Sequence, residues 1–319
     1  MPDRNYHESA PFSRFEHIRN EILLTLADVG IETKYGHSEV GKILEKDGTL
    51  LEQHEIEFMP RSLVEMAETI GIAKWVVRNV CVKYGVSASF SPKIILDHAG
   101  NGMHIHLCGM RNDRNILEDS QGGLSVEAKE MIGGILKFSP NLAAFGNPTP
   151  VSYLRLLGRR ESPMNITWGV SNRLALIRIP LWWNFKVAWE EVDSCRRTFE
   201  YRAPDATANV YLLLAGITLA VEYGLKNHEE SLNMAEELYV EDTSRKKKRL
   251  KHLPRSCSES ATNLRRDRRY YEAEGVFPRS IIDYTVKKLK AYKDSDLAQK
   301  VKDEPQKIEK LMQTYLHYG

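Results

Sequence analysis

Three short strings of charged and polar residues, each on a segment that favours strands, constrain this chain more than any other feature. They are QHEIEF at 53–58, NGMHIHL at 101–107 and FEYRAPD at 199–205. Side chains along a strand alternate between its two faces, so residues two apart share a face. The pairs that share a face are Glu55 with Glu57, His104 with His106, and Glu200 with Arg202. For any one pair alone, a half-exposed strand with a hydrated face is the simpler interpretation.

The three strings together favour a more specific chemistry. Carboxylates and imidazole suit Mg²⁺ or Mn²⁺ better than a thiolate zinc site, and arginines bind phosphate and carboxylate oxygens through two parallel hydrogen bonds. This combination is typical of phosphoryl transfer to an acid. The sequence contains neither a GxxxxGK[ST] loop nor a GxSxG elbow, so a Walker-type nucleotide site is excluded and a serine hydrolase gains no support.

Composition excludes several classes of partner. The 319 residues are 42% hydrophobic, and 45 basic against 43 acidic residues give a formal charge of +2, so no global field attracts nucleic acid or a membrane surface. The four cysteines show no paired CxxC spacing, which favours a reducing compartment. The chain has neither a long apolar run nor the apolar core of a secretory signal. We therefore expect a cytoplasmic protein.

Capping signals predict the first two helices. Ser13 with Glu16 precedes a helix expected at about 14–29 and stopped by Gly30, and Ser62 with Glu65 precedes a helix that runs to Gly85. The second helix is apolar around most of its circumference, which predicts burial.

Strands and further helices follow from turn signals and periodicity. Lys46-Asp47-Gly48 predicts a hairpin within 31–58. Further strands are expected at 87–96, 102–108, 173–179 and 197–203, and helices at 125–138 and 206–224, the latter capped by Asp205. Because strands and helices do not alternate regularly, the pattern favours an α+β fold with helices against an antiparallel sheet.

Two further features are interpreted as structural. From about residue 226 the chain is polar and helical, and its basic run 245–249 reads as a solvated helix, with a nucleic-acid or localisation role left as the alternative. The aromatic residues of the central region are expected to pack rather than to stack on bases. These are Trp182, Trp183, Trp189 and Tyr201.

The order and spacing of the motifs resemble the catalytic region of glutamine synthetases. The matching runs are GHSEV with QHEIEF, PKIILDHAGNGMHIH, NPTPVSYLRL, ESPMNITWGVSNRLALIRIP and FEYRAPDATANVYLLLAGI. The resemblance implies an antiparallel sheet that forms a metal-lined funnel backed by helices, with two Mg²⁺ or Mn²⁺ ions between ATP and glutamate. It implies that ATP phosphorylates the glutamate side chain and that ammonia then displaces phosphate.

The resemblance also implies roles for individual residues. Glu39 and Glu55 match ligands of one ion, and His104 and Glu200 match ligands of the other. His106 and Arg178 match positions beside the nucleotide, although a buried structural histidine and a structural strand arginine remain alternatives. The positions matched around glutamate and the transferred phosphoryl group are Gly100, His104, Arg155, Glu161, Arg173 and Arg202, of which Arg173, Glu161 and Arg202 match catalytic positions. Arg155 and Glu161 could instead pair with each other on a loop.

The chain departs from the family pattern in several places. GHSEV replaces the usual HHEV, Glu39 and Glu55 are 16 positions apart, about twice the family's gap, and Cys108 and Ser171 replace a serine and an arginine near the nucleotide. We expect residues 1–319 to form a catalytic domain, with 226–319 as its helical C-terminal portion. The family's small N-terminal domain and a strand with two more metal carboxylates have no counterpart here, which leaves the activity of the isolated chain open.

Three functions follow as hypotheses. The leading one is ATP-dependent ligation of ammonia to glutamate. A second is the same chemistry with another amine, and a third is a noncatalytic, ring-forming or regulatory relative. The resemblance implies a homo-oligomeric ring for the full-length form.

Overall fold

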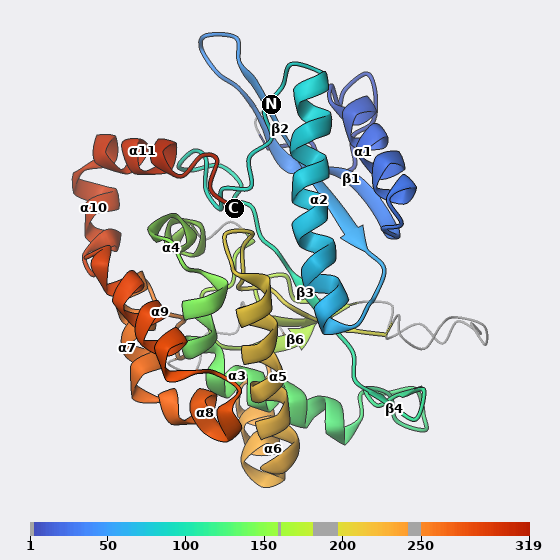
Figure 1. Ribbon diagram of the computed structural model, residues 1–319, viewed down its shortest axis with the longest axis vertical. Coiled ribbons are helices and arrows are strands. Elements are labelled where there is room, and N and C mark those ends of the chain that lie inside the picture. The colour runs from blue at the N-terminus through green and yellow to red at the C-terminus, as the bar shows by residue number, and fades with distance from the viewer. Residues whose placement is uncertain (1–2, 159–160, 181–196, 242–249) are drawn as a thin grey trace.

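The structure, a computed structural model, describes residues 3–158, 161–180, 197–241 and 250–319 (Figure 1). Trp182, Trp183, Trp189 and the basic run 245–249 lie outside these ranges. The fold contains both helices and sheets, and its strands and helices do not alternate in a βαβ pattern, which agrees with the predicted α+β class. Within the described ranges, no helix is long and apolar enough to cross a bilayer.

Among the residues that the structure describes, the central sheet has four short strands in the order β3, β8, β7, β6. Their bounds are β3 Ile105–Leu107, β6 Trp168–Val170, β7 Ile177–Ile179 and β8 Phe199–Tyr201. β8 pairs antiparallel with both β3 and β7, whereas β6 pairs parallel with β7. The expectation of a purely antiparallel sheet is therefore wrong for one pairing. Tyr201 is buried in the core, as predicted for a packing residue.

The N-terminal part is a separate layer of two helices and a hairpin, which Figure 1 shows in the upper half of the molecule. It comprises α1 Glu16–Asp28, β1 Thr33–Leu44, β2 Leu50–Phe58 and α2 Leu63–Lys83. The predicted turn is confirmed, because Gly48 joins β1 to β2 with a φ of +91°, a conformation that suits glycine. Gly30 ends α1 with a φ of +78°.

The start of α1 is capped from a distant strand. The predicted local capping box is wrong: α1 begins only at Glu16, and the Ser13 hydroxyl lies 3.5 Å from the Glu52 carboxylate of β2. Glu52 accepts hydrogen bonds from the backbone N–H of Arg14 at 2.9 Å and of Phe15 at 3.1 Å. A carboxylate at a helix N-terminus satisfies free N–H groups and the helix dipole. Tertiary structure therefore supplies the cap that local sequence was expected to supply.

The second capping box is confirmed. The predicted burial of its helix is correct for one face and wrong for the other. The Glu65 carboxylate accepts hydrogen bonds from the Ser62 backbone N–H at 3.2 Å and from its hydroxyl at 2.6 Å. One face of α2 is buried, whereas Trp75 is 63% exposed and Val82 is 73% exposed on the other. Val64 and Ile72 belong to the same exposed face. Apolar character around the circumference did not distinguish these two faces.

Within the described ranges, two hydrophobic cores hold the molecule together. The smaller joins α1 and α2 through residues such as Ile22, Leu26, Val76 and Val80. The larger packs the four-stranded sheet against α3 Val126–Gly146, α4 Pro150–Leu157 and α5 Val210–Lys226. The remaining elements are β4 Met110–Arg111, β5 Arg114–Asn115, α6 His228–Glu237, α7 Cys257–Arg266, α8 Arg268–Glu272, the 3₁₀ turn η3 Ala273–Gly275, α9 Arg279–Ala291, α10 Leu297–Asp303 and α11 Pro305–Thr314.

Two predictions for this part require correction, and one helix was not predicted. Residues 87–96 form no strand; Pro92 has no N–H to donate to a ladder. The helix α4 was not predicted, and α5 is capped by Asn209, whose side chain accepts from the Leu212 N–H, rather than by Asp205. After residue 226 the described ranges contain the helices α6 to α11.

Candidate functional site

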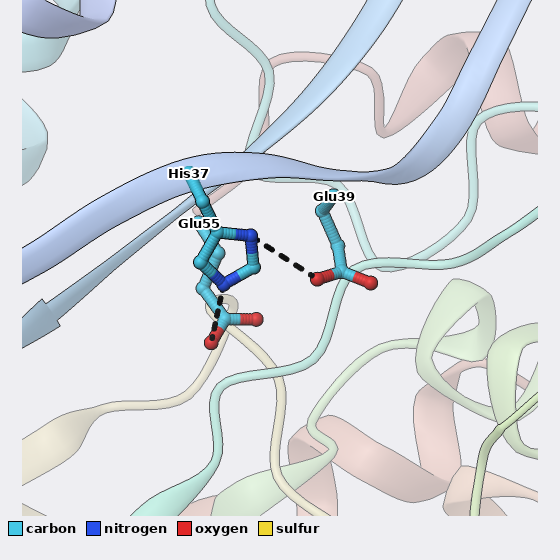
Figure 2. A group of neighbouring side chains, drawn as sticks. All are labelled: His37, Glu39 and Glu55. Atoms are coloured by element: carbon cyan, nitrogen blue, oxygen red, sulfur yellow. Dashed lines mark ion pairs between the residues drawn. The ribbon is translucent and has the colours of Figure 1, made fainter. Parts of the chain in front are cut away.

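A cluster of one imidazole and two carboxylates lies on the β1–β2 hairpin. His37 Nδ1 is 3.8 Å from Glu39 Oε2, and His37 Nε2 is 3.9 Å from Glu55 Oε1 (Figure 2). One ligand atom from each residue lies within 4.8 Å of the other two. These donors suit a divalent ion, so the residues present fit the metal that the sequence predicted for Glu39 and Glu55. The residue that sequence reasoning missed is His37.

A β-bulge decides which residues of the hairpin meet. Near the turn, Leu44 is the Cα partner of Leu50 and Lys42 that of Glu52. Continuing this register would place Glu39 opposite Glu55, but a shift between Ser38 and Lys42 places His37 opposite Glu55 instead. Bulges commonly reorient side chains beside functional sites. The signal for His37 was present in the sequence, because His37 precedes Glu39 by two positions and side chains two apart on a strand share a face.

The carboxylates of the cluster are difficult to ionise together. Burial, and then the negative charge of Glu39, raises the pKa of Glu55 to about 7. Burial also raises the pKa of Glu39. Two anions close together, partly removed from water, favour the protonated form unless a cation joins them. A bound cation would therefore stabilise the ionised form of both carboxylates.

We expect Mn²⁺ binding at this cluster to depend on pH. A metal competes with the proton on Glu55, whose pKa is about 7, so the apparent affinity should fall up to about tenfold per pH unit below that value and level off above it. Calorimetric titration with Mn²⁺ between about pH 6 and 8.5 measures the slope. Glu55→Gln should weaken binding at every pH, and an affinity constant across the range would contradict the prediction.

A second group surrounds Glu200 on β8. Its Oε1 lies 2.8 Å from His104 Nδ1 and 2.6 Å from Arg202 Nη1, and its Oε2 lies 3.0 Å from Arg178 Nη1. Burial alone would raise the pKa of Glu200, but the hydrogen bond from His104 and the charge of Arg202 hold that pKa well below its usual range. Burial and the charge of Arg202 lower the pKa of His104 to about 4. Neutral His104 therefore donates its Nδ1–H to Glu200.

The predicted second ion has fewer ligands around it. Within the described ranges, no third histidine, cysteine or acid joins His104 and Glu200 in a group with metal-ligand spacing. Both carboxylate oxygens of Glu200 already accept from cationic or imidazole groups. The metal role of His104 and Glu200 stays a prediction. Arg178 makes the contact expected of its structural alternative, so its nucleotide role also stays a prediction.

Arg155 is held at the buried end of α4. It is 3% exposed and donates to the carbonyl oxygens of Ala203 at 2.8 Å and Arg202 at 3.0 Å. Burial lowers its pKa to about 10, so it stays charged at neutral pH. A Cβ added to Gly100 would lie 3.0 Å from Arg155 Cγ and 2.8 Å from the Pro92 oxygen. Only glycine lets the 100–102 loop approach Arg155 this closely.

Glu161 and Arg173 form a more exposed pair. Arg173 Nη1 lies 3.5 Å from Glu161 Oε1, and its guanidinium lies 5.4 Å from the centre of the Tyr6 ring. Glu161 has a φ of +53°, which costs energy for a residue with a side chain. Its backbone oxygen accepts from Arg202 Nη2 at 3.1 Å. The alternative pairing of Arg155 with Glu161 is wrong, because each has another partner.

One cavity of about 1100 Å³ connects most of these residues. His106 lines it and lies 3.1 Å from the Thr198 hydroxyl through Nδ1. The predicted site residues along its wall are Glu39, Glu55, Gly100, His104, His106, Arg155, Glu161 and Arg202. A pocket this large accommodates a nucleotide-sized ligand. The fold thus brings the hairpin carboxylates and two of the arginines to one cavity.

The family model for the catalytic domain of glutamine synthetase matches residues 2–309. The chain belongs to the glutamine synthetase family. The glutamine synthetase of Thermococcus kodakarensis is 36% identical over 295 residues, and that of Pyrococcus horikoshii is 35% identical over 297 residues. Each alignment covers 92% of this chain and 62% of the relative.

Solved structures agree on the fold. A cryo-EM structure of Plasmodium falciparum glutamine synthetase superposes with a TM-score of 0.75 at 22% identity, covering 92% of this chain and 61% of that one. The chain therefore spans about three fifths of the length of these glutamine synthetases. The predicted resemblance to the family is confirmed. The funnel shape and the individual site roles remain predictions.

Proposed function

We propose that this chain carries the catalytic region of an ATP-dependent ligase that joins ammonia to the side-chain carboxylate of glutamate. The observation that supports this most strongly is one cavity lined by Glu39 and Glu55 of the hairpin together with Arg155 and Arg202, in a member of the glutamine synthetase family. A glutamate carboxylate oxygen would attack the γ-phosphorus of ATP and release ADP. Ammonia would then attack the acyl carbon and release phosphate.

The chain's own residues have distinct tasks in this proposal. Arg202 is fixed by Glu200 at 2.6 Å and by the Glu161 oxygen at 3.1 Å, so a positive charge is in place before the phosphoryl group arrives. The exposed Arg173 can bind the oxygens of that group, with Glu161 beside it. Divalent ions at the cluster would neutralise phosphate and carboxylate oxygens. Glu39 and Glu55 would hold one ion.

The wider assignments are part of the same proposal. We propose Mg²⁺ or Mn²⁺ and ATP at the cavity, His106 and Arg178 on the nucleotide side, and His104 with Glu200 at a second ion. Residues 1–319 would act as one catalytic domain whose C-terminal portion is helical. A homo-oligomeric ring in the full-length form and a cytoplasmic location complete the proposal.

The proposal predicts glutamate- and amine-dependent release of phosphate from ATP. The assay uses the full-length protein as it occurs in its cells, with Mg²⁺ or Mn²⁺ and with ammonia, hydroxylamine, ethanolamine and a polyamine as amines. Arg202→Lys should lower the rate by about 100-fold or more, because lysine cannot reproduce the planar two-point contact. Arg111→Ala, on the distant and exposed β4, is the matched control and should leave the rate unchanged.

Each outcome selects one hypothesis. Turnover with ammonia supports glutamine synthesis, and turnover with another amine alone moves the assignment to that amine. ATP and Mn²⁺ binding without turnover on any amine supports the noncatalytic relative and overturns the proposal. An unchanged rate in Arg202→Lys would remove Arg202 from the catalytic residues.

A further inference from the structure

The ring of His37 presents a nitrogen lone pair to the cluster. Its Nδ1 lies 2.9 Å from the Ser38 carbonyl oxygen, and a carbonyl oxygen only accepts, so the proton of the neutral ring belongs on Nδ1. Nε2 then carries a lone pair and lies 3.9 Å from Glu55 Oε1. Two acceptors face each other at a separation too long for a hydrogen bond. A cation between them would satisfy both.

The His37 ring is fixed in this orientation before any ligand arrives. The His7 ring stacks on it with centroids 4.3 Å apart and planes 11° apart, and the Tyr35 ring lies 5.7 Å away. The backbone N–H of His7 donates to the same Ser38 oxygen at 2.9 Å. The N-terminal segment therefore orients both the Ser38 carbonyl and the His37 ring. The His37 side chain is only 10% exposed. Histidine ligands of metals typically donate their other N–H to such an oxygen.

We propose that His37 Nε2 is a third protein ligand of the ion held by Glu39 and Glu55, and that it gives this site a preference for first-row transition ions over Mg²⁺. The inference rests on the proposed function and adds the nitrogen ligand and the class of ion. Mg²⁺ takes oxygen ligands in strict octahedral geometry and dehydrates reluctantly. Imidazole suits Fe²⁺, Ni²⁺, Cu²⁺ and Zn²⁺, and the affinity of a site with a nitrogen ligand rises along the first-row series from Mn²⁺ to Cu²⁺. A nitrogen ligand at this fixed position should therefore raise the affinity for transition ions relative to that for Mg²⁺.

The test measures Mn²⁺ and Mg²⁺ affinities of the same protein by calorimetry. Wild type should bind Mn²⁺ at least about tenfold more tightly than Mg²⁺, and the ratio should fall to within about threefold in His37→Asp, which offers only oxygen. His37→Gln is a second, uncharged variant. His17→Gln, on the exposed side of α1, is the matched control and should keep the wild-type ratio.

Pulsed electron paramagnetic resonance of bound Mn²⁺ gives a direct readout. His104→Asn removes the imidazole of the proposed second ion, and a ¹⁴N coupling from imidazole should persist in this variant. The coupling should disappear when His37→Asp or His37→Gln is added to His104→Asn. If circular dichroism shows that the His37 variants do not fold, the His104→Asn protein decides alone, because its coupling must then come from the cluster. No coupling in that protein overturns the inference.

Failure of the inference and failure of the proposed metal site have different signatures. If Glu55→Gln weakens Mn²⁺ binding while the His37 variants keep the ion preference and, in the His104→Asn background, the coupling, His37 is not a ligand and the proposed metal site stands. If Glu55→Gln leaves Mn²⁺ binding unchanged, the hairpin is not the metal site, and both proposals lose this support.

Discussion

Replacing Glu200 by glutamine is expected to lower the free energy of unfolding by about 3 to 5 kcal/mol. The Glu200 side chain is 3% exposed and contacts His104, Arg178 and Arg202 at 2.6 to 3.0 Å. An amide cannot neutralise two guanidinium groups, and it places its own N–H donors against other donors. Removing one partner of a buried ion pair leaves the other charge desolvated, which is why the expected loss is large.

Chemical denaturation monitored by circular dichroism measures this loss. Glu222→Gln is the matched control, because Glu222 makes an exposed pair with Lys226 at 2.6 Å on α5, and such pairs contribute about 0.5 kcal/mol or less. A loss below about 1 kcal/mol for Glu200→Gln would show that the buried group tolerates an uncompensated charge. It would also make Glu200 more available to a metal than its ion pairs indicate.

Gly134→Ala is expected to destabilise the protein by about 3 kcal/mol or more, or to prevent folding. α3 and α5 cross with their backbones in contact at this point. A Cβ on Gly134 would lie 2.1 Å from the Ala220 carbonyl oxygen, and a Cβ on Gly224 would lie 2.2 Å from the Glu130 oxygen. Both obstacles are helical backbone, which cannot move aside as a flexible side chain can. The two helices would have to separate.

Gly71→Ala is a control that is expected to raise stability rather than lower it. Gly71 lies on the exposed side of α2, and a Cβ there would have no atom within 4 Å. Alanine should therefore stabilise the helix by about 0.5 to 1 kcal/mol, because it restricts the unfolded chain more than glycine does. Thermal unfolding of the two variants distinguishes the effects, and equal shifts in Tm would contradict the proposed helix crossing.

Local sequence predicted those parts of the fold in which the signal and its partner are close together. The Ser62 capping box, the Gly48 turn and the Gly30 helix stop all depend on contacts within a few residues. The cap of α1 was mispredicted because its acceptor, Glu52, is supplied by a strand that tertiary packing brings there. α4 had an unused local signal, since Thr149 accepts from the Ser152 N–H and Pro150 is the first helical residue, an arrangement common at helix starts.

In the candidate site, too, contacts between residues close in sequence were predictable and contacts between distant segments were not. Side-chain alternation correctly placed Glu200 and Arg202 together, because it needs only the strand period. The same alternation places His37 and Glu39, which are two positions apart, on one face of β1. The partners of Arg155 could not be predicted, because they are backbone oxygens of a segment about fifty residues away that the sheet brings beside α4. Sequence predicts which groups are present better than which groups they contact.

The two hydrophobic cores have no buried residue in common. The carboxylate hairpin packs with the smaller core through Ile56 and Phe58, whereas Arg155 and Arg202 lie in or next to α4 and β8, which contribute to the larger. The two walls of the cavity can therefore open locally as separate cooperative units, each with its own protection against amide hydrogen exchange. A ligand that touches both walls would link the two units, so it should slow exchange in β2 and β8 together.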